Sequence, residues 1–227
     1  MIALAQIDGS DTLALYDKHV TMIEQAYQAG ATTIVFPEMS LTGYRTHDAN
    51  EYGIKLDDEQ INNFVKLSEL HKMTIVLGIP LKEDSVLYIA QAVIAPDREP
   101  KSYKKNILHA DEKPYFGAGA HPYILRKQNK KYGLAICYES LQREHIDLYK
   151  NDIDGYIASV AKTASAMDSA IQYYKTLARE RGIPILVANS TGYQDNFMAG
   201  GKSAIISSSG LVVEQLTEHK EGIILYR

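Results

Sequence analysis

Short apolar strands alternate with amphipathic helices along most of the chain, and this alternation limits the folds that it can adopt. Helices are predicted at 11–30, at 57–70 and at 166–181, each with a capping residue or a terminal glycine. Strands are predicted at 2–7, 33–36, 73–79, 86–95, 101–105, 123–126, 132–136, 154–160, 185–189, 203–207, 211–214 and 223–226. Several neighbouring strands are joined by short polar links, which indicates antiparallel pairs. The pattern predicts a mixed α/β sandwich.

Composition narrows the class of protein. The chain has 227 residues, of which 45% are hydrophobic and 23% charged, with a formal net charge of −4 and no low-complexity linker. This predicts one domain over 1–227. The acidic balance and the lack of a Lys/Arg run argue against nucleic-acid binding. No run approaches the roughly 20 apolar residues that span a bilayer. A single cysteine and an amino terminus that reads as a strand rather than a signal peptide predict a cytoplasmic protein.

That single cysteine, Cys137, follows the predicted strand at 132–136 and precedes a stretch with helical periodicity. A thiol at the amino terminus of a helix faces unpaired N–H groups and the positive end of the helix dipole. The sequence therefore predicts a lowered pKa for Cys137. The alternative is a small buried apolar residue, since unpaired cysteines are often buried. The predicted helical face carries Leu141, His145, Leu148 and Tyr149, where His145 is interpreted as a packing residue.

Three further charged residues are candidates for a catalytic site because of where they lie relative to the predicted strands. Glu38 ends a buried strand, Lys105 ends the extended stretch 101–105, and Glu112 lies in an irregular stretch after it. A carboxylate, an ammonium and a thiol form a consistent set for nucleophilic catalysis, because the carboxylate can accept the thiol proton and the ammonium can stabilise an oxyanion. Taken singly, each charge is more often a solvated surface residue. Periodicity alone does not bring them together.

Three segments, in order, resemble the signature blocks of the nitrilase superfamily, the carbon–nitrogen hydrolases. They are Phe36-Pro-Glu-Met-Ser-Leu-Thr-Gly-Tyr44, Tyr103-Lys-Lys-Asn-Ile-Leu108 and Gly133-Leu-Ala-Ile-Cys-Tyr-Glu139. The resemblance implies that Glu38 is the general base, Lys105 the catalytic lysine and Cys137 the nucleophile. It also implies that Glu112 positions the lysine and substrate, and that the backbone N–H of Tyr138 helps to hold the oxyanion. The fold it implies is a four-layer αββα sandwich that pairs into a homodimer.

The activity implied is hydrolysis of the C–N bond in a small linear amide through a thioester on Cys137, without a metal or an organic cofactor. Tyr138 directly after the nucleophile resembles amidase branches, whereas nitrilases more often have Trp there. Acyl transfer or nitrile hydrolysis on the same fold, and a non-catalytic binding module, are the alternatives.

One segment departs from the family pattern. After the strand at 154–160 many relatives carry a Pro and then a Trp, whereas this chain continues Ala158-Ser-Val-Ala-Lys162 and contains no Trp. That region lines the substrate pocket in relatives, so their specificity does not transfer. Arg45 or Lys162 could pair with a substrate carboxylate, although such residues are more often solvated.

Overall fold

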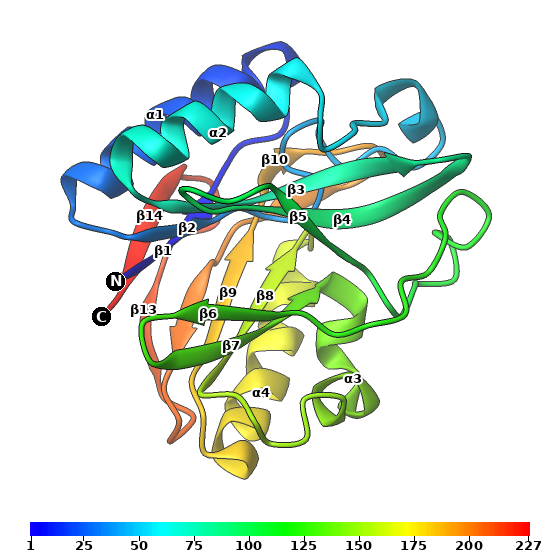
Figure 1. The fold of residues 1–227 in the computed structure, drawn as a ribbon. Helices are drawn as coiled ribbons and strands as arrows, with labels where there is room; N and C mark the ends of the chain where they lie inside the picture. Colours follow the sequence, from blue (N-terminus) through cyan, green and yellow to red (C-terminus); the bar gives the residue numbers. More distant parts are fainter.

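The computed structural model describes all residues, 1–227, and contains two six-stranded sheets packed face to face between two layers of helices (Figure 1). The first sheet has the strand order β14-β1-β2-β3-β4-β5, in which β1, β2 and β3 run parallel. Its strands are β1 (Ile2–Gln6), β2 (Thr33–Val35), β3 (Thr74–Glu83), β4 (Val86–Ile94), β5 (Lys101–Lys104) and β14 (Gly222–Tyr226). Helices α1 (Leu15–Gln28) and α2 (Glu59–His71) cover its outer face.

The second sheet has the order β13-β12-β9-β8-β7-β6, with β7, β8 and β9 parallel. Its strands are β6 (Ile124–Lys127), β7 (Lys130–Ile136), β8 (Gly155–Val160), β9 (Ile185–Asn189), β12 (Ala204–Ile206) and β13 (Val212–Gln215). Helices α3 (Arg143–Asp147) and α4 (Ala164–Arg181) cover its outer face. The predicted αββα sandwich is confirmed.

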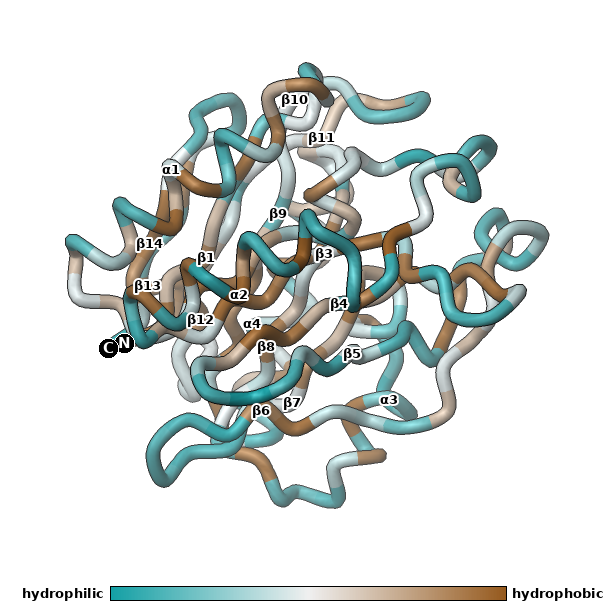
Figure 2. The backbone as a smooth tube through the Cα atoms, turned by 45° about the horizontal axis from the view of Figure 1, so that its top comes forward, coloured by the Kyte–Doolittle hydropathy of each residue, from teal (hydrophilic) through white to brown (hydrophobic).

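The apolar side chains form three layers that match this architecture. One lies between the first sheet and α1 and α2, a second between the two sheets, and a third between the second sheet and α3 and α4. Figure 2 shows the hydrophobic stretches along the central strands and the hydrophilic ones mainly in outer loops. Both faces of the parallel strands are therefore buried, which explains why they read as nearly continuous apolar runs.

The structure corrects the predicted helical starts. Asp11 caps a 3₁₀ helix, η1 (Thr12–Ala14), rather than α1 itself, and α2 starts after Asp58. After β7 the chain forms a 3₁₀ helix, η3 (Cys137–Leu141), and only then the five-residue α3. The predicted single helical face is wrong at Leu148, which is 44% exposed, while His145 and Tyr149 are buried. Helix α3 ends at Asp147, so Leu148 and Tyr149 lie in the turn that follows it and do not continue the helical face.

A two-stranded sheet and a third 3₁₀ helix were not predicted. Strands β10 (Thr191–Tyr193) and β11 (Met198–Gly200) pair in an antiparallel hairpin, and η2 (Ala49–Tyr52) lies in the long connection from β2 to α2. The hairpin follows β9 directly and carries its connecting residues towards the carboxyl ends of the parallel strands. None of the helices combines the length and the apolar character that crossing a membrane requires.

Candidate active site

The carboxyl ends of β2 and β7, one strand from each sheet, carry the predicted base and nucleophile. Glu38 follows β2 after Phe36 and Pro37, and Cys137 follows β7 directly. Cys137 has a φ of 47°, in the left-handed region that non-glycine residues rarely adopt. Such a backbone costs roughly 1–3 kcal/mol and turns the side chain out of the strand.

Gly78 on β3 allows the Glu38 segment to approach the sheet closely. A Cβ at this position would lie 2.0 Å from the carbonyl oxygen of Pro37 and 2.5 Å from the backbone N of Met39. Only glycine fits there without displacing the chain on either side of Glu38.

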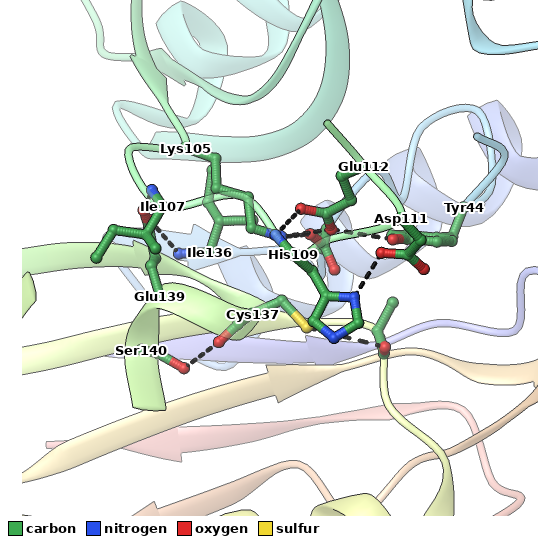
Figure 3. A network of polar contacts seen from close by, with 12 residues as sticks. Tyr44, Lys105, Ile107, His109, Asp111, Glu112, Ile136, Cys137, Glu139 and Ser140 are labelled. Atoms are coloured by element: carbon green, nitrogen blue, oxygen red, sulfur yellow. Dashed lines mark hydrogen bonds and ion pairs between the residues drawn. The ribbon is translucent and has the colours of Figure 1, made fainter. Parts of the chain in front are cut away.

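Lys105 joins two carboxylates beneath the surface. Its Nζ lies 2.8 Å from Glu38 Oε1. It also lies 2.6 Å from Glu112 Oε1 (Figure 3). The exposed fractions of Glu38, Lys105 and Glu112 are 1%, 0% and 2%. Burial alone would lower the pKa of Lys105, but the charges of Glu38, Cys137 and Glu112 outweigh it and raise that pKa. The ammonium is therefore held in its charged form.

Glu112 is fixed by further donors. Its Oε1 accepts a hydrogen bond from the Tyr44 hydroxyl at 3.0 Å, and its Oε2 accepts one from the backbone N of His109 at 2.8 Å. Burial raises the pKa of Tyr44, as do the neighbouring charges of Glu38 and Glu112, so its hydroxyl stays protonated and donates. Glu112 and Glu38 thus both hold the ammonium of Lys105.

Glu38 differs from Glu112 in having one oxygen free. Its Oε1 accepts from Lys105, whereas its buried Oε2 accepts no hydrogen bond from the protein. Burial raises the pKa of Glu38, against the opposing effects of Lys105 and the Cys137 thiol. A buried carboxylate with one free oxygen and a raised pKa is suited to accept a proton.

The Cys137 thiol has a raised pKa, so the prediction of a lowered one is wrong. Burial and the charge of Glu38 raise the pKa of Cys137 to about 11, while Lys162 and Lys105 act in the opposite direction. The helix that starts at Cys137 is a five-residue 3₁₀ helix, too short to supply the dipole assumed from the sequence. The thiol therefore requires a base at neutral pH.

A third glutamate, Glu139, connects the segments that carry the nucleophile and the lysine. Its Oε1 accepts a hydrogen bond from the backbone N of Ile136 at 2.8 Å, and its Oε2 accepts from the backbone N of Asn106 at 2.6 Å and of Ile107 at 3.1 Å. The Tyr103 hydroxyl also donates to Glu139. No role was predicted for Glu139, although a glutamate two residues after the nucleophile, next to an apolar strand, could have indicated one.

His145 lies behind Glu139 as a packing residue. Its ring nitrogens bond the hydroxyls of Tyr103 and Tyr156, and burial lowers its pKa to about 4. Both ring nitrogens are thus engaged by buried tyrosines, which supports the interpretation of His145 as a packing residue.

A pocket of about 290 Å³ lies above this cluster. Cys137 and Glu112 line the pocket, whereas Glu38 and Lys105 lie beneath it. Its lining residues are Tyr44, Thr46, His109, Asp111, Glu112, Cys137, Tyr138, Ala161, Lys162, Thr163, Ala166, Asp195, Asn196 and Phe197. The volume suits a small molecule.

Several of the lining residues were not predicted from the sequence. Tyr44, His109 and Phe197 line the pocket, and the His109 ring packs edge-on against Tyr138 at 5.1 Å between centroids. Tyr44 is the last residue of the first segment that resembles the nitrilase superfamily, and this position could have indicated a role at the site. Of the two cations considered, Lys162 lines the pocket, whereas Arg45 pairs with Asp48 outside it.

The profile of the carbon-nitrogen hydrolase family matches residues 1–227, the whole chain. The chain belongs to this family. It is 26% identical over 200 residues to a probable nitrilase from Schizosaccharomyces pombe, covering 85% of this chain and 74% of that protein. It is 27% identical over 232 residues to a glutamine-dependent NAD(+) synthetase from Acinetobacter baylyi, covering 97% of this chain but only 42% of the synthetase.

Solved structures show the same fold. An amidase from Nesterenkonia sp. AN1, in a form with acrylamide added at its active-site cysteine, superposes with a TM-score of 0.87 at 19% identity. The match covers 98% of this chain and 90% of that amidase. This carbon–nitrogen hydrolase therefore shares the nitrilase fold and carries a cysteine, a lysine and two glutamates together at one pocket.

Proposed function

We propose that this carbon–nitrogen hydrolase cleaves the amide bond of a small linear amide through a thioester on Cys137. The observation that supports this most strongly is a thiol in the floor of a small pocket, directly above a buried cluster of Glu38, Lys105 and Glu112. Burying three charges is costly and is retained where they orient one another for chemistry.

In the first half of the proposed reaction, Cys137 Sγ attacks the amide carbon while its proton passes to Oε2 of Glu38. The carbonyl oxygen becomes an oxyanion, which Lys105 Nζ and the backbone N–H of Tyr138 stabilise. When the oxyanion collapses, the C–N bond breaks and the nitrogen takes the proton from Glu38. Ammonia or an amine leaves, and the acyl group stays on Cys137 as a thioester.

In the second half, water attacks the thioester carbon and gives a proton to Glu38. The C–S bond breaks, the proton returns from Glu38 to the thiolate, and a carboxylic acid is released. Glu112 takes no proton in this scheme, because Lys105, Tyr44 and the backbone of His109 already donate to its oxygens. Its role is to orient Lys105.

Mass spectrometry of the intact protein tests the proposed reaction. After mixing with a panel of linear amides and rapid acid quenching, we expect an acyl adduct on Cys137 and none on the Cys137→Ala variant. Glu38→Gln is the matched variant, since it keeps the size of the base but cannot accept a proton. No adduct and no ammonia release with any amide would favour a binding module instead.

We propose amides rather than nitriles as substrates, because Tyr138 follows the nucleophile. Ammonia release from an amide and from the nitrile with the same carbon chain provides the comparison. Faster release from the nitrile would contradict the proposal, and hydroxamate formation exceeding hydrolysis in added hydroxylamine would favour acyl transfer.

We also propose that the chain pairs into a homodimer through its helical layers, as the family resemblance implies. Sedimentation at several protein concentrations tests this. A mass equal to that of a single chain throughout would contradict the pairing.

A further inference from the structure

The backbone of Lys162 is held in place between β8 and α4. Its N–H donates to Asn189 Oδ1 at 2.9 Å, and its carbonyl oxygen accepts from Asn189 Nδ2 at 3.1 Å and from the backbone N of Gly200 at 2.8 Å. Asn189 is fully buried at the end of β9. These three bonds fix the backbone of Lys162, and the segment places Lys162 at the pocket.

The Lys162 side chain forms no ion pair and no hydrogen bond, unlike the other charged groups that line the pocket. Glu112 accepts from Lys105, and His109 pairs with Asp111 at 2.5 Å. Asp195 accepts from the backbone N and the hydroxyl of Thr46. Lys162 is therefore the one charged side chain at the pocket that has no polar partner in the protein, and the group that complements its ammonium is an anion.

We propose that Lys162 binds a carboxylate of the substrate, so that the preferred amide is the monoamide of a short dicarboxylic acid. This rests on the proposed function for the amide end of the substrate. The first turn of α4 reinforces the site, because Thr163 and Ala166 line the same pocket and the amino-terminal end of a helix favours negative charge. The small volume restricts the acid to a short chain.

A cationic amide fits less well, although three carboxylates line the pocket. Each of these already accepts a hydrogen bond or ion pair from the protein. A substrate ammonium would have to compete with those donors and would approach Lys162. At Lys162 itself, the local charge therefore favours an anionic group of the substrate over a neutral or a cationic one.

The alternative role for Lys162 is to stabilise the thiolate, since its charge lowers the pKa of Cys137. The two roles differ in what they predict for neutral substrates. A thiolate stabiliser affects every amide equally, whereas an anchor for a carboxylate affects only amides that carry one.

The experiment compares succinamate with succinamide, and glutaramate with glutaramide, with β-alaninamide as the cationic probe. We expect the wild type to have a higher kcat/KM for each monoanion than for its neutral partner. In Lys162→Met we expect kcat/KM for the monoanions to fall about 10–100-fold, mainly through KM, as expected for loss of a hydrogen bond between charged groups. The ratio of monoanion to neutral amide should fall to about one.

Lys66→Met, an exposed position on α2, is the matched control and should retain the wild-type ratio. Lys162→Arg, which keeps the charge, should retain part of the preference for the monoanion. Equal losses on succinamate and succinamide in Lys162→Met would overturn the proposal in favour of thiolate stabilisation. No preference for monoanions in the wild type would also overturn it.

A binding measurement separates this inference from the proposed reaction. In Cys137→Ala, calorimetric titration with succinamate and succinamide reports charge recognition without chemistry. Tighter binding of succinamate that disappears in the Cys137→Ala/Lys162→Met double variant supports the site even if no amide is hydrolysed. Equal binding of the two compounds overturns it even if the enzyme is an amidase.

Discussion

Two adjacent lysines, Lys104 and Lys105, occupy opposite environments because successive residues of an extended segment face opposite ways. Lys105 is buried between Glu38 and Glu112, whereas Lys104 pairs with Glu83 at the surface. The family resemblance implied Lys105 as the catalytic lysine, and the structure places its ammonium between the two carboxylates.

We expect Lys105→Ala to lose about 10²–10³-fold in turnover, the usual effect of removing one oxyanion donor. It should also lose about 3–5 kcal/mol of stability, because two buried carboxylates remain without a cation. Without the ammonium, the pKa of Glu38 in the folded protein rises further above its unfolded value. The stability deficit against wild type should therefore be larger at pH 8 than at pH 5, which urea unfolding at both pH values measures.

Lys104→Ala provides the control for this pair. An exposed ion pair contributes little, so its activity and stability should stay within about 0.5 kcal/mol of wild type. If Lys104→Ala were the inactive variant, the assignment of the catalytic lysine would be wrong.

The raised pKa of Cys137 has a direct consequence for its reactivity. The thiolate is the reactive form, so below its pKa the alkylation rate should increase about tenfold per pH unit. With a pKa of about 11, labelling by iodoacetamide should keep rising from pH 7 to pH 10 without a plateau. A plateau below pH 8 would show that the thiolate is already formed, as the sequence alone had suggested.

At the scale of elements, the site depends on how β7 is attached to the segment after β5. Glu139 performs this attachment by accepting from backbone N–H groups on both sides. Because its partners are backbone groups, no pattern of side chains in the sequence reveals them. The resemblance located the nucleophile and lysine, but this bond between their segments required the fold.

We expect Glu139→Gln to destabilise the protein by about 1–3 kcal/mol, because the new amide N–H₂ faces backbone donors and leaves at least one of them unpaired. It should also lower kcat, since Cys137 and Lys105 lose their common support. Thermal unfolding and turnover on the best amide measure both effects. Glu144→Gln, an exposed change on α3, should alter neither, and a Glu139→Gln variant with wild-type kcat would contradict the positioning role.

The elements themselves were predictable to different degrees. The strand at 185–189 was predicted with its observed bounds. It is a short, mainly apolar run, and Gly182 and Pro184 end the helix that precedes it. The β10–β11 hairpin was not, because Thr191–Tyr193 and Met198–Gly200 are short and contain glycine. Its position depends on long-range bonds such as that from the backbone N of Gly9 to the carbonyl oxygen of Thr191.

At the scale of the whole molecule, the site is divided between the two sheets. Glu38 and Lys105 follow strands of the first sheet, and Cys137 and Lys162 follow strands of the second. The family resemblance implied Glu38, Lys105, Cys137 and the αββα architecture, but it did not show which charged groups of the pocket have partners. The lack of a partner for Lys162 becomes visible only when the segments after β2, β5, β7 and β8 and the turn between β10 and β11 are brought together.

Catalysis should therefore depend on the packing between the sheets more than on the packing of the outer helices. Leu134 on β7 is buried between the sheets, and Ile61 on α2 is buried between that helix and the first sheet. Changing either to Ala should cost about 2–5 kcal/mol, because each leaves a cavity in a close-packed layer. Only the cavity between the sheets lets the two halves of the site shift against each other.

We accordingly expect Leu134→Ala to lower both the free energy of unfolding and kcat, and Ile61→Ala to lower only the free energy. Urea unfolding followed by circular dichroism gives the first quantity, and turnover at saturating amide in the absence of urea gives the second. Displacements of about 1 Å in a catalytic arrangement can reduce the rate by about 10²-fold, so even partial relaxation around Leu134 is measurable. Equal kcat values for Leu134→Ala and wild type, at matched loss of stability, would mean that the bonds of Glu139 and Lys105 hold the two sheets in register without help from the core between them.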